Sequence, residues 1–194
     1  MSTLESTRVR DPARRDKILA AAAELIARRG YHAVSLADIG AAAGIVGSGV
    51  YRHFGSKAAI LVALLDQVMD RLLASAASLV TAGGGDARVL AALVADQAAF
   101  AVNDRYLVRL YQRELHTLPE ADRRRLRRRQ RHYVEEWVHV LARLRPGLPD
   151  AAVRARVYAS IGAIHSVAAY DSGLPRDEQV DLLAAMARAC LTAP

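Results

Sequence analysis

The sequence predicts an all-α protein of about nine helices, organised as a three-helix N-terminal domain and a larger helical C-terminal domain. Apolar residues recur at helical spacing along almost all of the 194 residues, and strand-like alternation bounded by turn residues is missing. Alanine and leucine, which both favour helices, supply about a third of the chain. With 53% hydrophobic and 24% charged residues, the composition excludes disordered and low-complexity chains.

Glycine and serine residues mark the ends of the first two expected helices. The apolar face of the first helix has the spacing i, i+4, i+7 and i+8 at Ile18, Ala22, Leu25 and Ile26. Gly30 is expected to end this helix as its C-terminal cap. Ser35, with Asp38 three positions later, has the spacing of a capping box and begins a second, short helix that Gly44 ends.

A third short helix is expected from Gly47 to His53, followed by a long helix from Lys57 to Ala82. Two short helices that cross steeply cannot bury their apolar faces alone, so we expect them to pack on the first helix. We place Phe54 in that core, under the first helix. The segment from Ser35 to Lys57 therefore predicts a helix-turn-helix.

Gly83 to Gly85 forms the one obvious flexible break, and five more helices follow it. They are expected near residues 86–102, 104–116, 119–145, 150–172 and 176–192. Their boundaries are marked by Asn103, by Pro119, by the turn from Pro146 to Pro149, and by Gly173 with Pro175.

The net charge of +7 is concentrated in two basic regions. Residues 1–57 contain nine Lys or Arg residues against five acids, and residues 123–131 contain seven arginines, so the remainder is net acidic. Two basic regions on an acidic body favour a polyanion such as nucleic acid as partner. A solvated, arginine-rich surface without a partner is the alternative.

Several classes of protein are excluded by simple features. The longest aliphatic run, Ile60 to Leu65, is far shorter than the roughly 20 residues of a membrane-spanning helix. The N-terminus has no apolar stretch typical of a secretory signal. Cys190 is the only cysteine, so no internal disulfide is possible and we expect the reducing cytoplasm. No HExxH, GxSxG, P-loop or dinucleotide fingerprint occurs, and we therefore expect neither an enzyme nor a cofactor.

Two alternatives remain from other functional classes. His132, Glu136 and His139 lie on one helical face and could hold a metal ion in an enzyme, although an exposed arginine-rich helix is usually just surface. A helical adaptor could instead recognise proteins through the arginine-rich helix. Such an adaptor would show no saturable, sequence-selective binding to DNA.

Two stretches of the N-terminal region have a recognisable pattern, ILAAAAELIARRGYHAVSLADIGAAAGI and VYRHFGSKAAIL. Over about residues 14–65 they resemble the DNA-binding domain of TetR-family transcriptional repressors. The resemblance implies a helix-turn-helix DNA-binding domain at residues 1–56 and a helical effector-binding and dimerisation domain at residues 57–194. The function it implies is a homodimeric repressor that a small hydrophobic effector releases from a palindromic operator.

The same resemblance implies which residues contact double-stranded DNA. It assigns phosphate contacts to Tyr51, His53 and Lys57. Ser35 can add its hydroxyl, and Arg52 is expected to contact the DNA backbone. We expect Val46 and Ser48 to touch base edges, with Gly47 allowing close approach of the main chain. The alternatives are a core position for Tyr51 and a helix-capping role for His53.

The C-terminal helices are expected to provide a dimer interface and an effector pocket. The last two helices carry apolar stripes and small residues, which favours a four-helix interface between two copies. Candidate effector-binding residues, each of which ordinary core packing would also explain, are Phe100, Leu107, Leu110, Tyr111, Trp137, Leu141 and His165. The segment ELHTLPEADRRRLRRRQRHY resembles a region of some actinobacterial members that sense acyl-CoA thioesters, whose phosphates arginines would suit. A solvated face is the alternative for these arginines.

Overall fold

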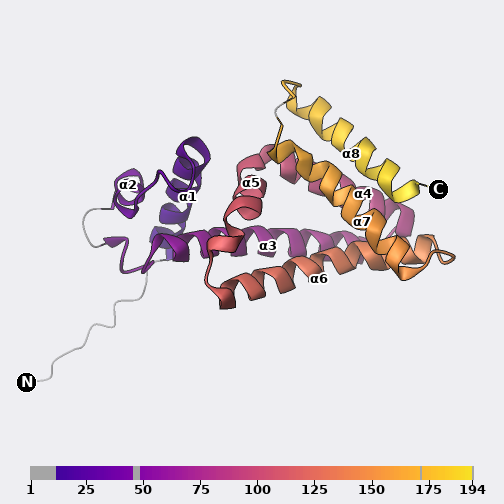
Figure 1. Cartoon of the computed structure of the whole chain (residues 1–194), viewed down its shortest axis with the longest axis horizontal. Helices are drawn as coiled ribbons and strands as arrows, with labels where there is room; N and C mark the ends of the chain where they lie inside the picture. Colours follow the sequence, from indigo (N-terminus) through magenta and orange to yellow (C-terminus); the bar gives the residue numbers. More distant parts are fainter. Residues whose placement is uncertain (1–11, 46–48, 171, 194) are drawn as a thin grey trace, which may run out of the picture. The chain divides into compact units, whose positions relative to one another are not determined.

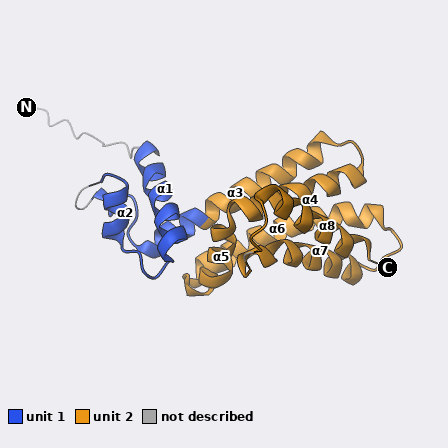
Figure 2. Ribbon diagram, turned by 90° about the horizontal axis from the view of Figure 1, so that it is seen from above, with its two compact units in different colours: residues 1–64 blue, residues 65–194 orange. Residues whose placement is uncertain are grey.

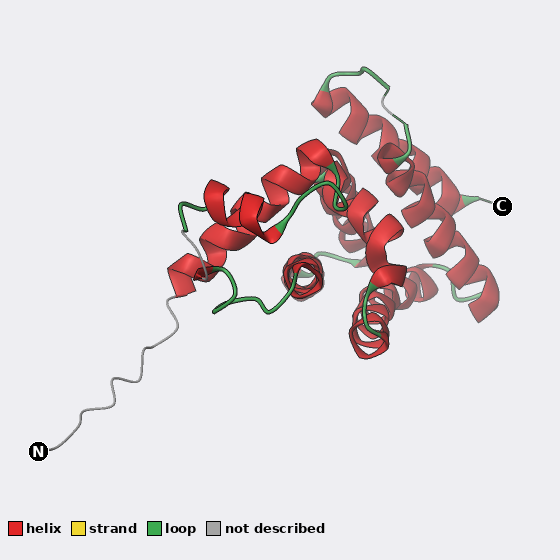
Figure 3. Cartoon of the chain, turned by 60° about the vertical axis from the view of Figure 1, so that its left-hand side comes forward, coloured by secondary structure: helices red, strands yellow, loops and turns green. Residues whose placement is uncertain are grey.

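The protein is seen in a computed structural model that describes residues 12–45, 49–170 and 172–193. These described residues form eight α-helices and no strand (Figures 1 and 3). The chain divides into two compact units, residues 1–64 (unit 1) and residues 65–194 (unit 2), shown in Figure 2. The all-α prediction is confirmed.

Unit 1 is built from α1 (Pro12–Arg29), α2 (Leu36–Ala42) and the first residues of α3 (Lys57–Ala82). Helix α1 packs against α2, and its buried side chains include Ile18, Leu19, Ala22 and Ile26. Gly30 ends α1 at a φ of 83°, a conformation that glycine adopts without steric cost, and its N–H donates to the Ile26 carbonyl at 2.9 Å. The core of unit 1 therefore forms on the face that the apolar spacing predicts.

The expected helix from 47 to 53 differs in the structure. Residues 46–48 lie outside the described residues, Gly49 has a 3₁₀ conformation, and residues 50–53 form a turn. That turn is closed by hydrogen bonds of 2.9 Å from the N–H groups of His53 and Phe54 to the Val50 carbonyl. A segment this short, with glycine near its start, gains few intrahelical hydrogen bonds, so its described part is a turn and not an α-helix.

Unit 2 contains the rest of α3 and five further α-helices. They are α4 (Asp86–Asn103), α5 (Arg105–Glu114), α6 (Glu120–Leu144), α7 (Asp150–His165) and α8 (Arg176–Thr192). Helix α7 packs against α8, and α4 contacts α5, α6, α7 and α8 (Figure 1). Because α4 touches four neighbours, it buries nine of its residues, including Phe100 and the polar Gln97.

Two expected helices of unit 2 end early. Helix α5 stops at Glu114 and continues as the 3₁₀ helix η2 (Leu115–Thr117), because Leu118 precedes a proline and is extended, with ψ of 154°. Helix α7 stops at His165 and continues as the 3₁₀ helix η3 (Ser166–Ala168). There the Ser166 hydroxyl donates to the Ala163 carbonyl at 2.7 Å and so binds a helix-end carbonyl that a further α-helical turn would otherwise use.

Among the helices that the structure describes, none combines the length and the apolar character needed to cross a membrane.

Candidate functional site

The start of α2 is fixed by a capping box. The Asp38 N–H donates to the Ser35 hydroxyl oxygen at 3.1 Å, and the Ser35 N–H donates to the Asp38 carboxylate at 2.8 Å. The Ser35 hydroxyl also donates to that carboxylate at 2.5 Å, and these bonds hold the pKa of Asp38 below its usual range. The predicted cap is confirmed, and the Ser35 side chain is engaged within the protein.

Close main-chain packing joins α2 to the segment that follows it. A Cβ atom on Gly40 would lie 2.9 Å from Cγ2 of Val50 and 3.1 Å from the Ile45 carbonyl oxygen. A Cβ atom on Gly49 would lie 2.4 Å from Cγ2 of Ile45. Glycine at 40 and 49 therefore lets the turn after α2 fold back onto that helix. This packing role of Gly49 was not predicted from the sequence.

Three of the residues predicted to contact DNA lie around the turn after Val50. Tyr51 is 61% exposed, so it is not a core aromatic. Arg52 is exposed and His53 is half-buried. Phe54 is buried, as expected, and the Arg15 guanidinium of α1 lies 5.1 Å from its ring centroid. The other predicted DNA-contact residues near here, Val46, Gly47 and Ser48, lie outside the described residues.

Lys57, the first residue of α3, forms hydrogen bonds with the loop between α1 and α2. Its ammonium donates to the main-chain carbonyls of Tyr31 and Val34, both at 2.9 Å, and to that of His32 at 3.4 Å. It also lies 4.5 Å from the centroid of the Tyr31 ring. The side chain thus donates hydrogen bonds to carbonyls of the loop that have no helical partner. This structural role was not predicted from the sequence.

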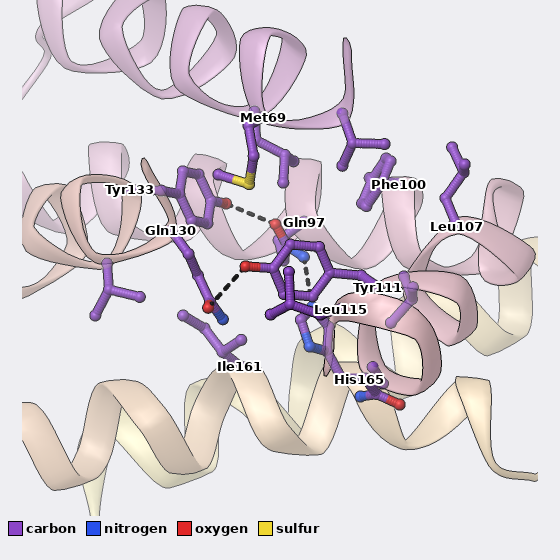
Figure 4. Close-up of a pocket in the computed structure, with 15 residues that line it drawn as sticks. Met69, Gln97, Phe100, Leu107, Tyr111, Leu115, Gln130, Tyr133, Ile161 and His165 are labelled. Carbon is purple, nitrogen blue, oxygen red and sulfur yellow. Dashed lines mark hydrogen bonds between the residues drawn. The ribbon is translucent and has the colours of Figure 1, made fainter. Parts of the chain in front are cut away.

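Unit 2 contains an apolar cavity of about 240 Å³ between α3, α4, α5, α6 and α7 (Figure 4). Its apolar and aromatic lining is Val68, Met69, Leu72, Phe100, Leu107, Val108, Tyr111, Leu115, Tyr133, Val134 and Ile161. The remaining lining residues are polar but uncharged at neutral pH: Gln97, Gln112, Gln130 and His165.

Three contacts link the polar lining residues into a chain of three side chains and a separate pair. The Tyr133 hydroxyl donates to Oε1 of Gln97 at 2.7 Å, and Nε2 of Gln97 lies 3.0 Å from Nε2 of His165. On another side, the Tyr111 hydroxyl donates to Oε1 of Gln130 at 3.0 Å, as the dashed lines of Figure 4 show. Buried polar groups that are paired in this way do not oppose folding.

Burial sets the protonation of these groups. Desolvation lowers the pKa of His165 to about 4, so its imidazole is neutral at pH 7. Burial raises the pKa of Tyr111 to about 12 and moves that of Tyr133 upward as well, so both phenols stay protonated. The cavity is therefore electrically neutral under physiological conditions.

Four of the seven residues predicted for the effector pocket line this cavity: Phe100, Leu107, Tyr111 and His165. Leu110, Trp137 and Leu141 do not line it; they are buried in the core. Leu110 lies on another face of α5, whereas Trp137 and Leu141 continue the cavity-lining face of α6 beyond the end of the cavity. Gln97, which is only 1% exposed, lines the cavity but was not among the predicted residues. Its signal was a single amide on an otherwise apolar helix face.

The arginines of residues 123–131 mostly make ion pairs. Arg125 and Arg129 of α6 reach the same carboxylate oxygen of Asp66 on α3, at 2.5 and 3.2 Å, and Arg129 also pairs with Asp70. Arg123 and Arg124 pair with Glu120 of their own helix. Three further arginines on this helix are exposed: Arg127, Arg128 and Arg131. The run therefore attaches α6 to α3 and leaves a smaller exposed basic group.

Helices α7 and α8 expose an apolar surface, which we call the α7–α8 face. It contains three large side chains, Tyr158, Leu182 and Met186, and small residues that include Ala159 and Gly162. The other apolar side chains along the stripes of these two helices and the turn after α7 are buried within the chain: Val153, Val157, Ile161, Ile164, Ala168 and Leu183. They pack inward because α7 and α8 lie against α4.

The metal-binding alternative finds no support in the geometry. Across residues 12–45, 49–170 and 172–193, no three His, Cys, Asp or Glu side chains are grouped closely enough to hold a metal ion. His132, Glu136 and His139 are included in that range.

Comparisons with known proteins agree with this architecture. Residues 18–64 match the model for bacterial regulatory proteins of the tetR family. The chain is 30% identical over 145 residues to the HTH-type transcriptional repressor KstR2 of Rhodococcus jostii, a match that covers 74% of this chain and 70% of that protein.

Solved structures extend the likeness to nearly the whole chain. A TetR-family transcriptional regulator from Bordetella parapertussis superposes with a TM-score of 0.81 at 23% identity, covering 94% of this chain and 96% of that one. AibR, solved with isovaleryl coenzyme A and operator DNA, gives a TM-score of 0.76 at 21% identity, covering 89% and 97%. Proteins of the tetR family regulate transcription and are not enzymes. The family model in unit 1, the extended match to a repressor and the shared fold together show that the chain belongs to the TetR family of DNA-binding transcriptional regulators.

Proposed function

We propose that the chain is a homodimeric repressor that an apolar effector, such as an acyl-CoA thioester, releases from a palindromic operator. Residues 1–56 would bind DNA, and residues 57–194 would bind the effector and form the dimer. The observation that carries the effector part of the proposal is the neutral, apolar cavity of about 240 Å³ in unit 2. The relative in Rhodococcus jostii is itself named a repressor, which supports this mode of regulation.

The exposed turn of unit 1 would provide the DNA contacts. Tyr51 and Arg52 are exposed and His53 is partly so, and all three can donate hydrogen bonds to phosphate oxygens. Lys57 adds positive charge at the start of α3, where the main-chain N–H groups of the helix also favour an anion. Ser35 at the start of α2, with Val46, Gly47 and Ser48, completes the proposed interface.

The α7–α8 face would join two copies. Tyr158, Leu182 and Met186 are large apolar side chains that water covers in the single chain, at 53%, 48% and 49% exposure. A second copy would bury them, and Ala159 and Gly162 would allow close approach of the helices. Pairing matters for function because one short recognition segment makes few contacts, whereas two related by a twofold axis can bind both halves of a palindrome.

The cavity and the arginine run fit different parts of an acyl-CoA. Apolar side chains of five helices would surround the acyl group, and the exposed Arg127, Arg128 and Arg131 would attract its phosphates. The structural neighbour AibR, which shares the fold, was solved with isovaleryl coenzyme A, and this supports the class of effector.

Release follows from a population shift. An effector lowers operator affinity only to the extent that it binds the DNA-incompetent conformation more tightly than the competent one. Helix α3 is the proposed connection, since it begins at Lys57 and carries the cavity residues Val68, Met69 and Leu72.

The test is selection of bound fragments from the source genome, followed by fluorescence anisotropy on the selected operator with and without octanoyl coenzyme A. We expect saturable binding that weakens at least tenfold with the thioester, a change of about 1.4 kcal/mol. Replacing Tyr51 by alanine should weaken binding, because a hydrogen bond to a phosphate oxygen is lost.

Tyr170→Ala is the matched control, since Tyr170 is also an exposed tyrosine (71%) but lies in unit 2. Equal operator affinity of the Tyr51→Ala and Tyr170→Ala variants would contradict the proposed interface. Failure to select any fragment at low ionic strength would contradict the function itself.

A further inference from the structure

Tyr133, Gln97 and His165 form a chain of hydrogen bonds in the cavity, and the chemistry of these side chains determines which atom donates in each bond. Tyr133 is 4% exposed, and its hydroxyl hydrogen is accepted by Oε1 of Gln97. The Gln97 amide is therefore oriented with its nitrogen toward His165. An amide nitrogen is only a donor, so Nε2 of His165 must accept with its lone pair. The reverse orientation of the amide would leave the buried Tyr133 hydroxyl without an acceptor, which is unfavourable.

This direction fixes the tautomer of His165. A neutral imidazole carries one hydrogen, and with Nε2 acting as the acceptor that hydrogen lies on Nδ1. Burial lowers the pKa of His165 to about 4, which keeps the ring in this neutral form at pH 7. Nδ1–H is then a donor on a residue that lines the cavity, and it makes no hydrogen bond within the part of the chain that the structure describes.

The second polar pair gives the cavity the same bias. Oε1 of Gln130 accepts from the Tyr111 hydroxyl, so the Gln130 amide nitrogen keeps its hydrogens for another partner. Oε1 of Gln97, Oε1 of Gln130 and Nε2 of His165 thus each already accept a hydrogen bond, whereas hydrogens on the Gln130 amide and on Nδ1 of His165 remain to be donated. Gln112 is the one amide outside this pattern, and it is exposed to solvent.

We propose that the cavity binds an uncharged, largely apolar group that carries a carbonyl, as in a ketone, an ester or a thioester, and that this carbonyl accepts a hydrogen bond from Nδ1–H of His165. The inference rests on the proposed function in taking the occupant to be the effector. A carboxylate would also accept, but no charged side chain lines the cavity to compensate its desolvation. An ammonium would likewise be desolvated, and no carboxylate lines the cavity to compensate its charge. At about 240 Å³ the cavity is below the roughly 300–1,000 Å³ of complete drug-sized sites, so it suits the carbonyl-bearing end of a larger effector.

The binding test uses four compounds of similar length on the full chain without DNA: methyl octanoate, methyl heptyl ketone, octanoate and octylamine. Isothermal titration calorimetry should show the ester and the ketone binding at least tenfold more tightly than the carboxylate and the amine. Equal or tighter binding of octanoate or octylamine overturns the proposal, and so does failure of both neutral compounds to bind at millimolar concentration.

Variants at position 165 test the donor itself. His165→Phe keeps an apolar ring but removes the donor, and it should weaken ester binding about tenfold, as expected for one neutral hydrogen bond. His165→Asn places an amide N–H close to the Nδ1 position and should retain most of the affinity. Equal affinity of the wild type and His165→Phe overturns the proposal. Thermal melting of each variant shows whether it is folded.

Nitrogen NMR of the wild-type chain gives a readout independent of affinity. The His165 ring, assigned by its loss in either variant, should show a protonated Nδ1 and an unprotonated Nε2. Protonation at Nε2 overturns the inference. Because these measurements omit DNA, they test this inference separately from the proposed function. Carbonyl-selective binding without release of the operator would contradict the proposed function alone. Release of the operator by a charged effector that occupies the cavity would contradict this inference alone.

Discussion

Lys57 contacts Tyr31 in two ways: its ammonium donates a hydrogen bond of 2.9 Å to the Tyr31 carbonyl and lies 4.5 Å from the centroid of the Tyr31 ring. A lysine expected to contact DNA phosphate thus also holds the loop between α1 and α2 in place through hydrogen bonds. Any measurement of its role in DNA binding must therefore include stability.

Lys57→Met should lower the free energy of unfolding by about 2 kcal/mol, because hydrogen bonds from a charged group to three main-chain carbonyls are lost. Chemical denaturation monitored by circular dichroism measures this change. Lys17→Met is the control, since Lys17 is exposed on α1 and we expect a change within about 0.5 kcal/mol. Equal stability of the two variants would show that the Lys57 contacts contribute nothing measurable.

Gly40→Ala should destabilise unit 1 by about 1–2 kcal/mol, although alanine is the better helix former. The new Cβ atom would lie 2.9 Å from Cγ2 of Val50, a buried and β-branched side chain with little freedom to move. Thermal melting measures the effect. Gly55→Ala is the matched control because a Cβ atom there meets nothing within 4 Å. A Gly40→Ala protein as stable as Gly55→Ala would mean that the turn yields without cost.

Met186→Glu should convert the proposed dimer to monomers without unfolding the chain. The side chain is 49% exposed, so the fold does not depend on burying it, whereas a carboxylate at an apolar interface would be desolvated without a partner. Light scattering after size-exclusion chromatography measures the mass, and operator affinity should fall at least tenfold with it. Leu174→Glu, at a 40% exposed leucine outside α7 and α8, serves as the control. A Met186→Glu protein with the mass of a dimer would place the interface elsewhere.

The free energy of unfolding should fall as the pH drops from about 6.5 to about 4 because of His165. Burial lowers the pKa of its imidazole to about 4 in the folded chain, while in the unfolded chain it titrates near 6.5. The unfolded state therefore binds the proton first, so the contribution is complete above the unfolded value and is lost as the pH falls toward the folded one. The loss approaches about 3 kcal/mol.

Denaturation at pH 7 and pH 5 with the wild type and His165→Asn isolates this contribution. Hydrogen bonds from Arg154 and Arg143 lower the pKa values of Glu135 and Asp86, so the contributions of these two carboxylates to stability are also lost in acid. That loss is the same in both proteins. The variant should show the smaller decrease. The same decrease in both would contradict the burial of a neutral His165.

Local features of the sequence predicted the local features of the structure. The capping box of Ser35 and Asp38, the glycine that ends α1 and the apolar spacing of α1 involve residues within about one or two helical turns of each other. Side chains far apart in the chain were harder to place. Trp137 is an aromatic on the correct helix, yet it is wholly buried and does not line the cavity, while Gln97 does.

Residue spacing and caps were enough to predict that this protein is helical, where most of its helices begin and end, and that about its first third resembles the TetR DNA-binding domain. They did not predict that Lys57 binds three main-chain carbonyls, that Arg125 and Arg129 join α6 to α3, or that Gln97 and His165, 68 residues apart, meet in one cavity. Helix propensity and capping act between neighbours in the chain, whereas a cavity and the direction of its hydrogen bonds depend on which helix faces pack together.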